Sequence, residues 1–251
     1  MRLIRPFVLA AVMGFSTSTS ADSQDPHAAQ RAALLGEIAA MARATGFETG
    51  YPAFSKAVMA AMGKVERHRF VPFDEVRYAY ENRPLPIGHG QTISQPYIVA
   101  LMTELAAPKP GDVVLEVGTG SGYQAAVLAE LAAEVYTIEI VEAVGKQGAV
   151  NLQAAGYRNV HPRIGDGYHG WPEVAPFDSI LVTAAAPEVP PALIEQLKPG
   201  GRLVIPVGGR WDVQELLVIE KNEDGSTTTK KTIPVRFVPL TRSAPPSGKT
   251  R

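Results

Sequence analysis

The spacing of hydrophobic residues along the chain changes near residue 111. Before this point they recur three and four positions apart, a pattern that predicts amphipathic helices. One helix is expected over residues 28–45, a second after Pro52 and a third directly after Ser94. Residues 78–90 are rich in Pro, Gly and Asn, so they are interpreted as a loop.

After residue 111, short apolar runs alternate with helical stretches. Such alternation predicts a doubly wound α/β fold, in which helices cover both faces of a parallel sheet. The last two runs, 214–220 and 227–233, are joined by a turn at 222–225 and predict an antiparallel hairpin at one edge. The other predicted strands cover residues 113–117, 135–138, 160–164, 179–182 and 202–207. The expected sheet is therefore mostly parallel and seven-stranded.

These patterns divide the chain into segments. A helical segment at 22–110 precedes a Rossmann-like domain at 111–242. Residues 243–251 have no hydrophobic pattern and are expected to form a disordered tail.

Residues 1–21 have the order of a secretory signal peptide. Arg2 and Arg5 precede an apolar stretch at 7–15, and small residues follow at 16–21. The apolar stretch is too short to span a bilayer, so the mature chain is expected to be periplasmic or secreted and free of the membrane. The alternative is a disordered or wrongly started extension on a cytoplasmic protein.

The composition is that of an ordinary globular protein and excludes several kinds of site. The formal net charge is −1, which provides no electrostatic surface for nucleic acid. The sequence has no cysteine, which excludes disulfides, thiolate metal sites and cysteine nucleophiles. His68, His89, His161 and His169 do not have metal-binding spacing, so no metal site is predicted.

A glycine-rich turn follows the strand predicted at 113–117. Gly118, Gly120 and Gly122 let backbone N–H groups approach a nucleotide-like ligand with no Cβ in the way. A dinucleotide-binding fingerprint requires its third glycine at the position that Tyr123 occupies. The turn therefore predicts a nucleoside pocket but does not favour a nicotinamide cofactor. A tight turn without a ligand is the alternative.

Acidic residues accompany the turn at the carboxyl ends of successive strands. Glu116 precedes the first glycine, and a carboxylate there suits a cation better than a pyrophosphate. Glu139 is placed to accept ribose hydroxyls, and Asp166, next to Gly167, is placed to meet an adenine amino group. Singly, Glu139 is equally explained as a solvated strand end and Asp166 as an Asx-turn residue. Their order predicts a pocket for S-adenosylmethionine.

The chain resembles the protein-L-isoaspartate O-methyltransferases from about residue 65 to residue 241. Besides the glycine turn, the resemblance is carried by RHRFVP at 67–72, LPIG at 85–88, QTISQP at 91–96, GDG at 165–167, TAAAP at 183–187, LKPGGR at 197–202 and VPLT at 238–241. The segment 92–96 is specific to this family. The signal-like extension departs from the family, which is usually cytosolic.

The resemblance implies a methyltransferase-type fold and roles for several residues. It makes Ser94 the active-site residue and places a substrate loop before it, with Gln91 and Thr92 toward the acceptor. The segment 238–241, which includes Thr241, resembles the part that lines the peptide groove. Ile87 and Gly88 are assigned to the cofactor. The implied partners are isoaspartyl-containing proteins and peptides, and the enzyme is expected to be monomeric.

The expected chemistry needs no strong base. A peptide carboxylic acid has a pKa of roughly 3.3–4.3, so it is already a nucleophilic anion at neutral pH. Catalysis by alignment and desolvation then suffices, with the Ser94 hydroxyl holding the carboxylate in line. The methyl ester would collapse to a succinimide, and hydrolysis of the succinimide would return some normal aspartate and so repair the protein. On local grounds alone, Ser94 is better interpreted as the N-cap of the following helix.

Three alternative functions share these features. A methyltransferase of the same fold with a small-molecule or RNA acceptor is the nearest. A nicotinamide-dependent dehydrogenase shares the fold but not the complete glycine fingerprint. A binding module without turnover is the third.

Overall fold

The computed structural model describes residues 25–209 and 212–242. The predicted signal peptide at 1–21 and the predicted tail at 243–251 lie outside the described residues. Within the described ranges, no helix has both the length and the apolar character needed to cross a membrane.

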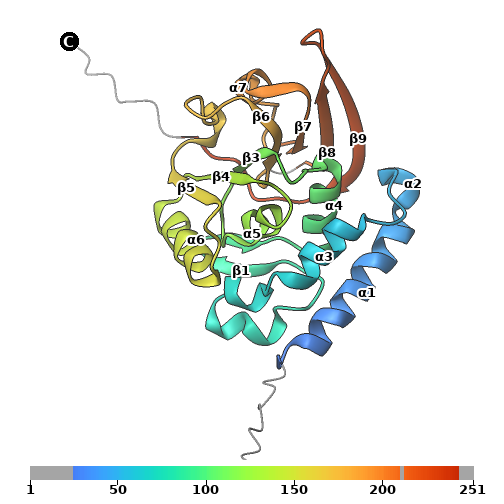
Figure 1. Cartoon of the computed structure of the whole chain (residues 1–251), viewed down its shortest axis with the longest axis vertical. Coiled ribbons are helices and arrows are strands. Elements are labelled where there is room, and N and C mark those ends of the chain that lie inside the picture. Colours follow the sequence, from blue (N-terminus) through green and yellow to red (C-terminus); the bar gives the residue numbers. More distant parts are fainter. Residues whose placement is uncertain (1–24, 210–211, 243–251) are drawn as a thin grey trace, which may run out of the picture.

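A seven-stranded sheet forms the centre of the molecule, in the order β5-β4-β3-β6-β7-β8-β9 (Figure 1). The strands are β3 (Val113–Val117), β4 (Glu134–Glu139), β5 (Val160–Ile164), β6 (Phe177–Val182), β7 (Leu197–Val207), β8 (Gln214–Lys221) and β9 (Thr227–Val235). Strands β3 to β7 are parallel, and β8 and β9 continue the sheet antiparallel. The predicted fold class is confirmed. Strand β7 begins earlier than predicted because Leu197 already pairs with Phe177 before a register shift.

Alternate residues of the strands enter two different hydrophobic cores. Val114 and Leu181 belong to the core covered by α4 (Pro96–Ala106), α5 (Tyr123–Ala129) and α6 (Glu142–Ala155). Leu115 and Ile180 belong to the second core, which includes Leu193 of α7 (Pro191–Glu195). Both faces of β3 and β6 are thus buried, which explains why their sequences are mostly apolar.

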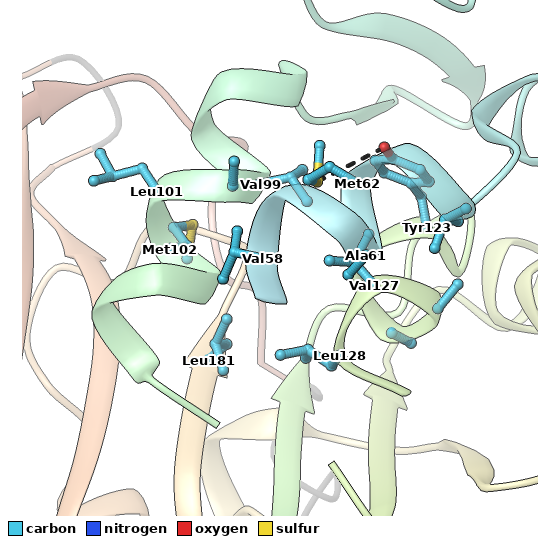
Figure 2. Close-up of a cluster of buried hydrophobic side chains, with 14 of the residues drawn as sticks. Val58, Ala61, Met62, Val99, Leu101, Met102, Tyr123, Val127, Leu128 and Leu181 are labelled. Carbon is cyan, nitrogen blue, oxygen red and sulfur yellow. Dashed lines mark hydrogen bonds between the residues drawn. The ribbon is translucent and has the colours of Figure 1, made fainter. Parts of the chain in front are cut away.

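Three N-terminal helices precede the sheet, and buried side chains of the first and third belong to the first core. The helices are α1 (Ala28–Ala44), α2 (Gly46–Thr49) and α3 (Lys56–Lys64), which lie on the flank of the molecule opposite α6 (Figure 1). Figure 2 shows Val58 and Met62 of α3 among side chains of α4 and α5, with the Tyr123 hydroxyl donating to Met62 Sδ at 4.0 Å. The helix predicted after Pro52 begins only at Lys56, because the Ser55 side chain caps it by accepting from Val58 N at 3.2 Å.

The segment predicted as a loop at 78–90 contains more regular structure than expected. Two short 3₁₀ helices, Arg67–Phe70 and Phe73–Tyr78, lead into a separate hairpin of β1 (Leu85–Gly88) and β2 (Gln91–Ile93). These strands have four and three residues, too few to show an alternating pattern, and β1 contains a proline and a glycine. The loop prediction is therefore wrong for residues 85–88.

Candidate active site

A cavity that is partly open to solvent lies at the carboxyl ends of the central strands. Strand β3 lies between β4 and β6, so the chain winds outward in opposite directions from this point of the sheet. Ligands of open α/β sheets bind at such a switch point. Nine of the residues predicted from the sequence line the cavity: Gln91, Thr92, Ser94, Glu116, Gly118, Gly120, Glu139, Gly167 and Thr241.

The first glycine of the turn brings the backbone against Thr183, which follows β6. Gly118 has a φ of +106°, and a Cβ there would lie 2.3 Å from Thr183 Oγ1. That hydroxyl donates to the Gly118 carbonyl oxygen at 2.7 Å, and Gly118 N donates to Ile138 O at 2.8 Å. A side chain at this position would collide with Thr183 and strain the backbone, so the turn requires glycine.

Glu139 ties the end of β4 to the glycine turn. Its Oε2 accepts from Gly120 N at 3.0 Å, and its Oε1 accepts from Val141 N at 2.9 Å. The residue is buried at the cavity wall. Because each carboxylate oxygen can accept a second hydrogen bond, Glu139 retains the capacity to bind ribose hydroxyls.

Glu116 is fully buried beneath the turn. Thr137 Oγ1 donates to Glu116 Oε2 at 2.5 Å and lies 2.7 Å from Thr119 Oγ1. Glu116 Oε1 has no hydrogen-bond partner among the described residues. Burial raises the pKa of Glu116 to about 8; the hydrogen bond from Thr137 opposes this rise, and the charge of Glu139 adds to it. A buried acceptor of this kind is stabilised when a cation binds beside it.

These two acids fit a cationic nucleoside without phosphate. The unpartnered oxygen of Glu116 can compensate a positive charge, and Glu139 can hold a ribose. A pyrophosphate would instead meet two carboxyl groups in a buried wall. The residues present therefore fit S-adenosylmethionine.

The Ser94 side chain belongs to the cavity and not to the end of α4. The N-cap residue of α4 is Gln95, and Tyr97 N donates to the Asn82 side-chain oxygen at 3.0 Å. The interpretation of Ser94 as a helix cap is therefore wrong, because a residue of a distant segment caps this helix. The hydroxyls of Thr92, Ser94 and Thr241 form no hydrogen bond with another residue in the described part of the chain.

Four predicted site residues lie outside the lining of this cavity. Ile87 and Gly88 line a neighbouring hollow on the other side of the turn, and Ile87 Cδ1 is 3.8 Å from a Cβ built on Gly120. Gly122 packs against α6, where its Cβ would lie 2.8 Å from Leu152 Cγ. The Asp166 carboxylate accepts from Tyr168 N at 3.0 Å and caps the 3₁₀ turn Gly167–His169.

Comparison with known proteins identifies the family. A family model described as "Protein-L-isoaspartate(D-aspartate) O-methyltransferase (PCMT)" matches residues 48–244. The chain belongs to this family. It is 64% identical over 208 residues to "Protein-L-isoaspartate O-methyltransferase 2" of Polaromonas sp., a match that covers 83% of this chain and 99% of that protein. It is 56% identical over 239 residues to "Protein-L-isoaspartate O-methyltransferase 1" of Cupriavidus necator, covering 95% and 92% of the two chains.

Solved structures agree with this assignment to the isoaspartate methyltransferase family. One titled "protein-L-isoaspartate O-methyltransferase" has a TM-score of 0.73 and 28% identity, and the match covers 83% of this chain and 65% of that chain. A Plasmodium falciparum structure, described as a complex with S-adenosyl-L-homocysteine, has a TM-score of 0.71 at 24% identity, with 84% and 98% covered. The second likeness supports the fold alone. The resemblance inferred from the sequence motifs is confirmed.

The structure adds Thr183, which was not assigned from the sequence, to the isoaspartate methyltransferase site, and it places the segment 238–241 in the lining of the cavity. Thr183 fixes the glycine turn, and Val238, Pro239 and Leu240 line the cavity beside Thr241. The segment 238–240 is held by a parallel β-bridge between Ala185 and Pro239, in which Leu240 N donates to Ala185 O at 2.7 Å. Thr183 and residues 238–240 belong to the family motifs at 183–187 and 238–241, so a signal was present, although nothing in the sequence indicates that these two motifs meet.

Proposed function

We propose that this chain transfers a methyl group from S-adenosylmethionine to the free α-carboxylate of L-isoaspartyl residues in damaged proteins. One observation carries the proposal beyond family membership. The same cavity joins a buried acidic wall, with Glu116 and Glu139, to the unbonded hydroxyls of Thr92 and Ser94. The acidic wall suits a cationic nucleoside, and the hydroxyls of Thr92 and Ser94 suit a carboxylate acceptor.

The cofactor, when bound, supplies an electrophilic methyl group. The protein's residues then have three tasks at this end of the cavity. The backbone of the glycine turn leaves room for the nucleoside, Glu139 accepts ribose hydroxyls and Glu116 compensates positive charge. None of these groups needs to gain or lose a proton during the transfer.

At the acceptor end, Ser94 donates a hydrogen bond that holds the carboxylate in line with the methyl group. Thr92 is the second donor, and 238–241 close the groove beside it. The carboxylate is ionised at neutral pH and needs no base. Alignment, together with removal of water from the carboxylate, lowers the barrier. The resulting methyl ester collapses to a succinimide, whose hydrolysis returns part of the population to normal aspartate.

The direct test measures methanol released from an isoaspartyl peptide and from the same peptide with normal aspartate. We expect release only from the isoaspartyl peptide. Equal methylation of both peptides, or methylation of RNA or a small carboxylic acid instead, would overturn the proposed acceptor. Tight binding of S-adenosylhomocysteine without turnover on any carboxylate would identify a binding module.

We also propose that the chain is exported and works as a monomer without nucleic acid. The basic, apolar and small-residue order of 1–21 supports export, and the net charge of −1 supports the absence of a nucleic-acid partner. N-terminal sequencing of the protein from its native source should find a start at or near Asp22. An intact Met1 would contradict export, and a dimer in light scattering would contradict the monomer.

A further inference from the structure

A second cavity continues from the active-site cavity toward the end of β9. The two cavities share Thr92, Ser94, Thr183 and Val238. The second is otherwise lined by Pro84, Gln95, Ile98 and residues 234–237. An acceptor whose carboxylate lies at Ser94 can therefore extend its neighbouring residues along this surface.

Arg236 gives this surface its charge. It is the one charged residue among those lining the second cavity, all of which are described. Two polar neighbours are already engaged, because the Gln95 amide donates to Asn82 O at 3.0 Å and Thr183 Oγ1 donates to Gly118 O at 2.7 Å. The positive charge of Arg236 is thus the strongest unengaged polar feature beside Thr92 and Ser94.

The Arg236 guanidinium has no acidic partner in the described part of the chain. It is exposed and forms no ion pair or hydrogen bond with a described residue. Glu215 is near in register, since it lies opposite Pro234 on β8, but it does not pair with Arg236. Other arginines, in contrast, have partners. Arg83 forms an ion pair with Glu81, and the Arg242 guanidinium lies over the Tyr168 ring.

We propose that Arg236 is a specificity residue that favours acceptor peptides carrying a second carboxylate close to the isoaspartyl residue. The inference rests on the proposed function. A guanidinium can hold a carboxylate by two parallel hydrogen bonds, so it favours an acidic neighbour and disfavours a basic one. Because Arg236 is exposed, water and salt screen its charge, so we expect a preference of only about two- to fivefold in kcat/KM.

The test compares three isoaspartyl peptides that differ only in the residues beside the isoaspartate, which are Glu, Gln or Lys. The wild-type kcat/KM should fall from Glu to Gln to Lys, by about two- to fivefold at each step. Arg236→Glu should reverse the order, and Arg236→Gln should abolish it. The differences should shrink at 0.5 M salt, where the Debye length is only a few ångström.

Lys231→Glu is the matched control. Lys231 is exposed on β9 outside the second cavity, and its substitution changes the net charge as much as Arg236→Glu does. The control should retain the wild-type order of the peptides. If it reversed the order equally, the effect would come from overall charge and the inference would be wrong.

Other results separate this inference from the proposed function. Equal kcat/KM values for all three peptides with the wild type would overturn the role of Arg236 and leave the function intact. An equal loss on all three peptides in Arg236→Gln would assign the residue to the reacting carboxylate or to folding, and would also overturn the inference. Methylation of none of the peptides would overturn the proposed function, and the inference with it.

Discussion

The cavity has a cofactor wall, formed by 116–121 and 138–141, and an acceptor wall, formed by 91–94 and 238–241. In the cofactor wall the polar side chains are buried and mostly bonded to the protein itself. In the acceptor wall the hydroxyls of Thr92, Ser94 and Thr241 form no hydrogen bond with another described residue. The Glu139 carboxylate accepts hydrogen bonds from two backbone N–H groups, and Glu116 accepts one from the Thr137 hydroxyl. Thr92 and Thr241 are exposed, and Ser94 is half-buried. The cofactor wall is therefore rigid before any ligand binds, and the acceptor wall is adaptable.

The difference matches the two ligands proposed for the site. A cofactor of constant structure is bound best by a wall whose groups are fixed in advance. Damaged proteins vary in the residues around each isoaspartate, and they require a wall that recognises little besides one carboxylate. The cost of this arrangement is the burial of Glu116 with an unpartnered oxygen.

The largest effect is expected from Gly118→Ala, which places a Cβ against Thr183 at a positive φ. We expect at least a hundredfold loss of cofactor affinity and a stability loss on the order of 2 to 4 kcal/mol, from backbone strain and overpacking. Calorimetric titration and urea unfolding measure the two quantities. Gly111→Ala is the control, because its Cβ meets no atom within 4 Å. Unchanged affinity in Gly118→Ala would show that the cofactor wall is not rigid.

Ser94→Ala tests the acceptor wall. We expect kcat to fall about tenfold to hundredfold, the value of one hydrogen bond to a charged group, with cofactor affinity unchanged. Stability should change by less than about 0.5 kcal/mol, because Ser94 caps no helix. Steady-state kinetics and thermal unfolding measure both.

Ser55→Ala is the matched control for this prediction. Ser55 does cap α3, so its loss should cost about 1 kcal/mol of stability and leave kcat unchanged. If the two variants showed the same loss of stability and the same activity, Ser94 would have no special role in the acceptor wall.

Glu116→Gln tests the charge of the cofactor wall. Its raised pKa, about 8 against a usual 4.5, means that the folded protein keeps a proton that the unfolded chain loses. Stability without ligand should therefore decline from about pH 4.5 to pH 8 in the wild type, at up to roughly 1.4 kcal/mol per pH unit, and decline less in Glu116→Gln. Urea unfolding at pH 5.5 and 7.5 measures this slope.

The same substitution should weaken cofactor binding about tenfold at pH 8.5, because wild-type affinity for a cation rises as Glu116 ionises. Titrations at pH 6.5 and 8.5 should show this rise in the wild type and not in Glu116→Gln. Glu37→Gln, on the exposed side of α1, should behave as the wild type. Equal pH dependence in Glu116→Gln would place the titrating group elsewhere.

The smallest effect is expected from Asn82→Ala, which removes the acceptor for Tyr97 N at the start of α4. The loss should be about 1 kcal/mol of stability, with kcat reduced only slightly because Ser94 remains. Thermal unfolding with parallel kinetics measures it. A loss of activity as large as that of Ser94→Ala would mean that α4 positions the acceptor wall and that the serine hydroxyl does not act alone.

The sequence alone determined that the sheet is mostly parallel and seven-stranded with an antiparallel hairpin at one edge, and it located part of the cofactor wall. Val113–Val117 has the predicted bounds, because a strand buried on both faces carries a strong local pattern. Val160–Ile164 also has the predicted bounds, although it is an edge strand in which only Val160 is buried. Glu116, Gly118 and Glu139 could be found because a residue's place at a strand's carboxyl end is a local property. The motifs likewise sufficed to recognise the family.

Only the tertiary structure decided how segments distant in sequence meet. Asn82 accepts a hydrogen bond at the start of α4, so Ser94 does not cap this helix. Thr183 packs against Gly118, and Arg236 lies beside the acceptor wall. The tertiary structure also formed the β1–β2 hairpin from strands too short to show a period. Such contacts depend on the packing of the whole chain and leave no periodic trace in the sequence. For this reason local patterns sufficed to predict residues such as Glu116, Gly118 and Glu139 in the cavity lining, whereas the capping of α4 and the contact of Thr183 with Gly118 could not be predicted.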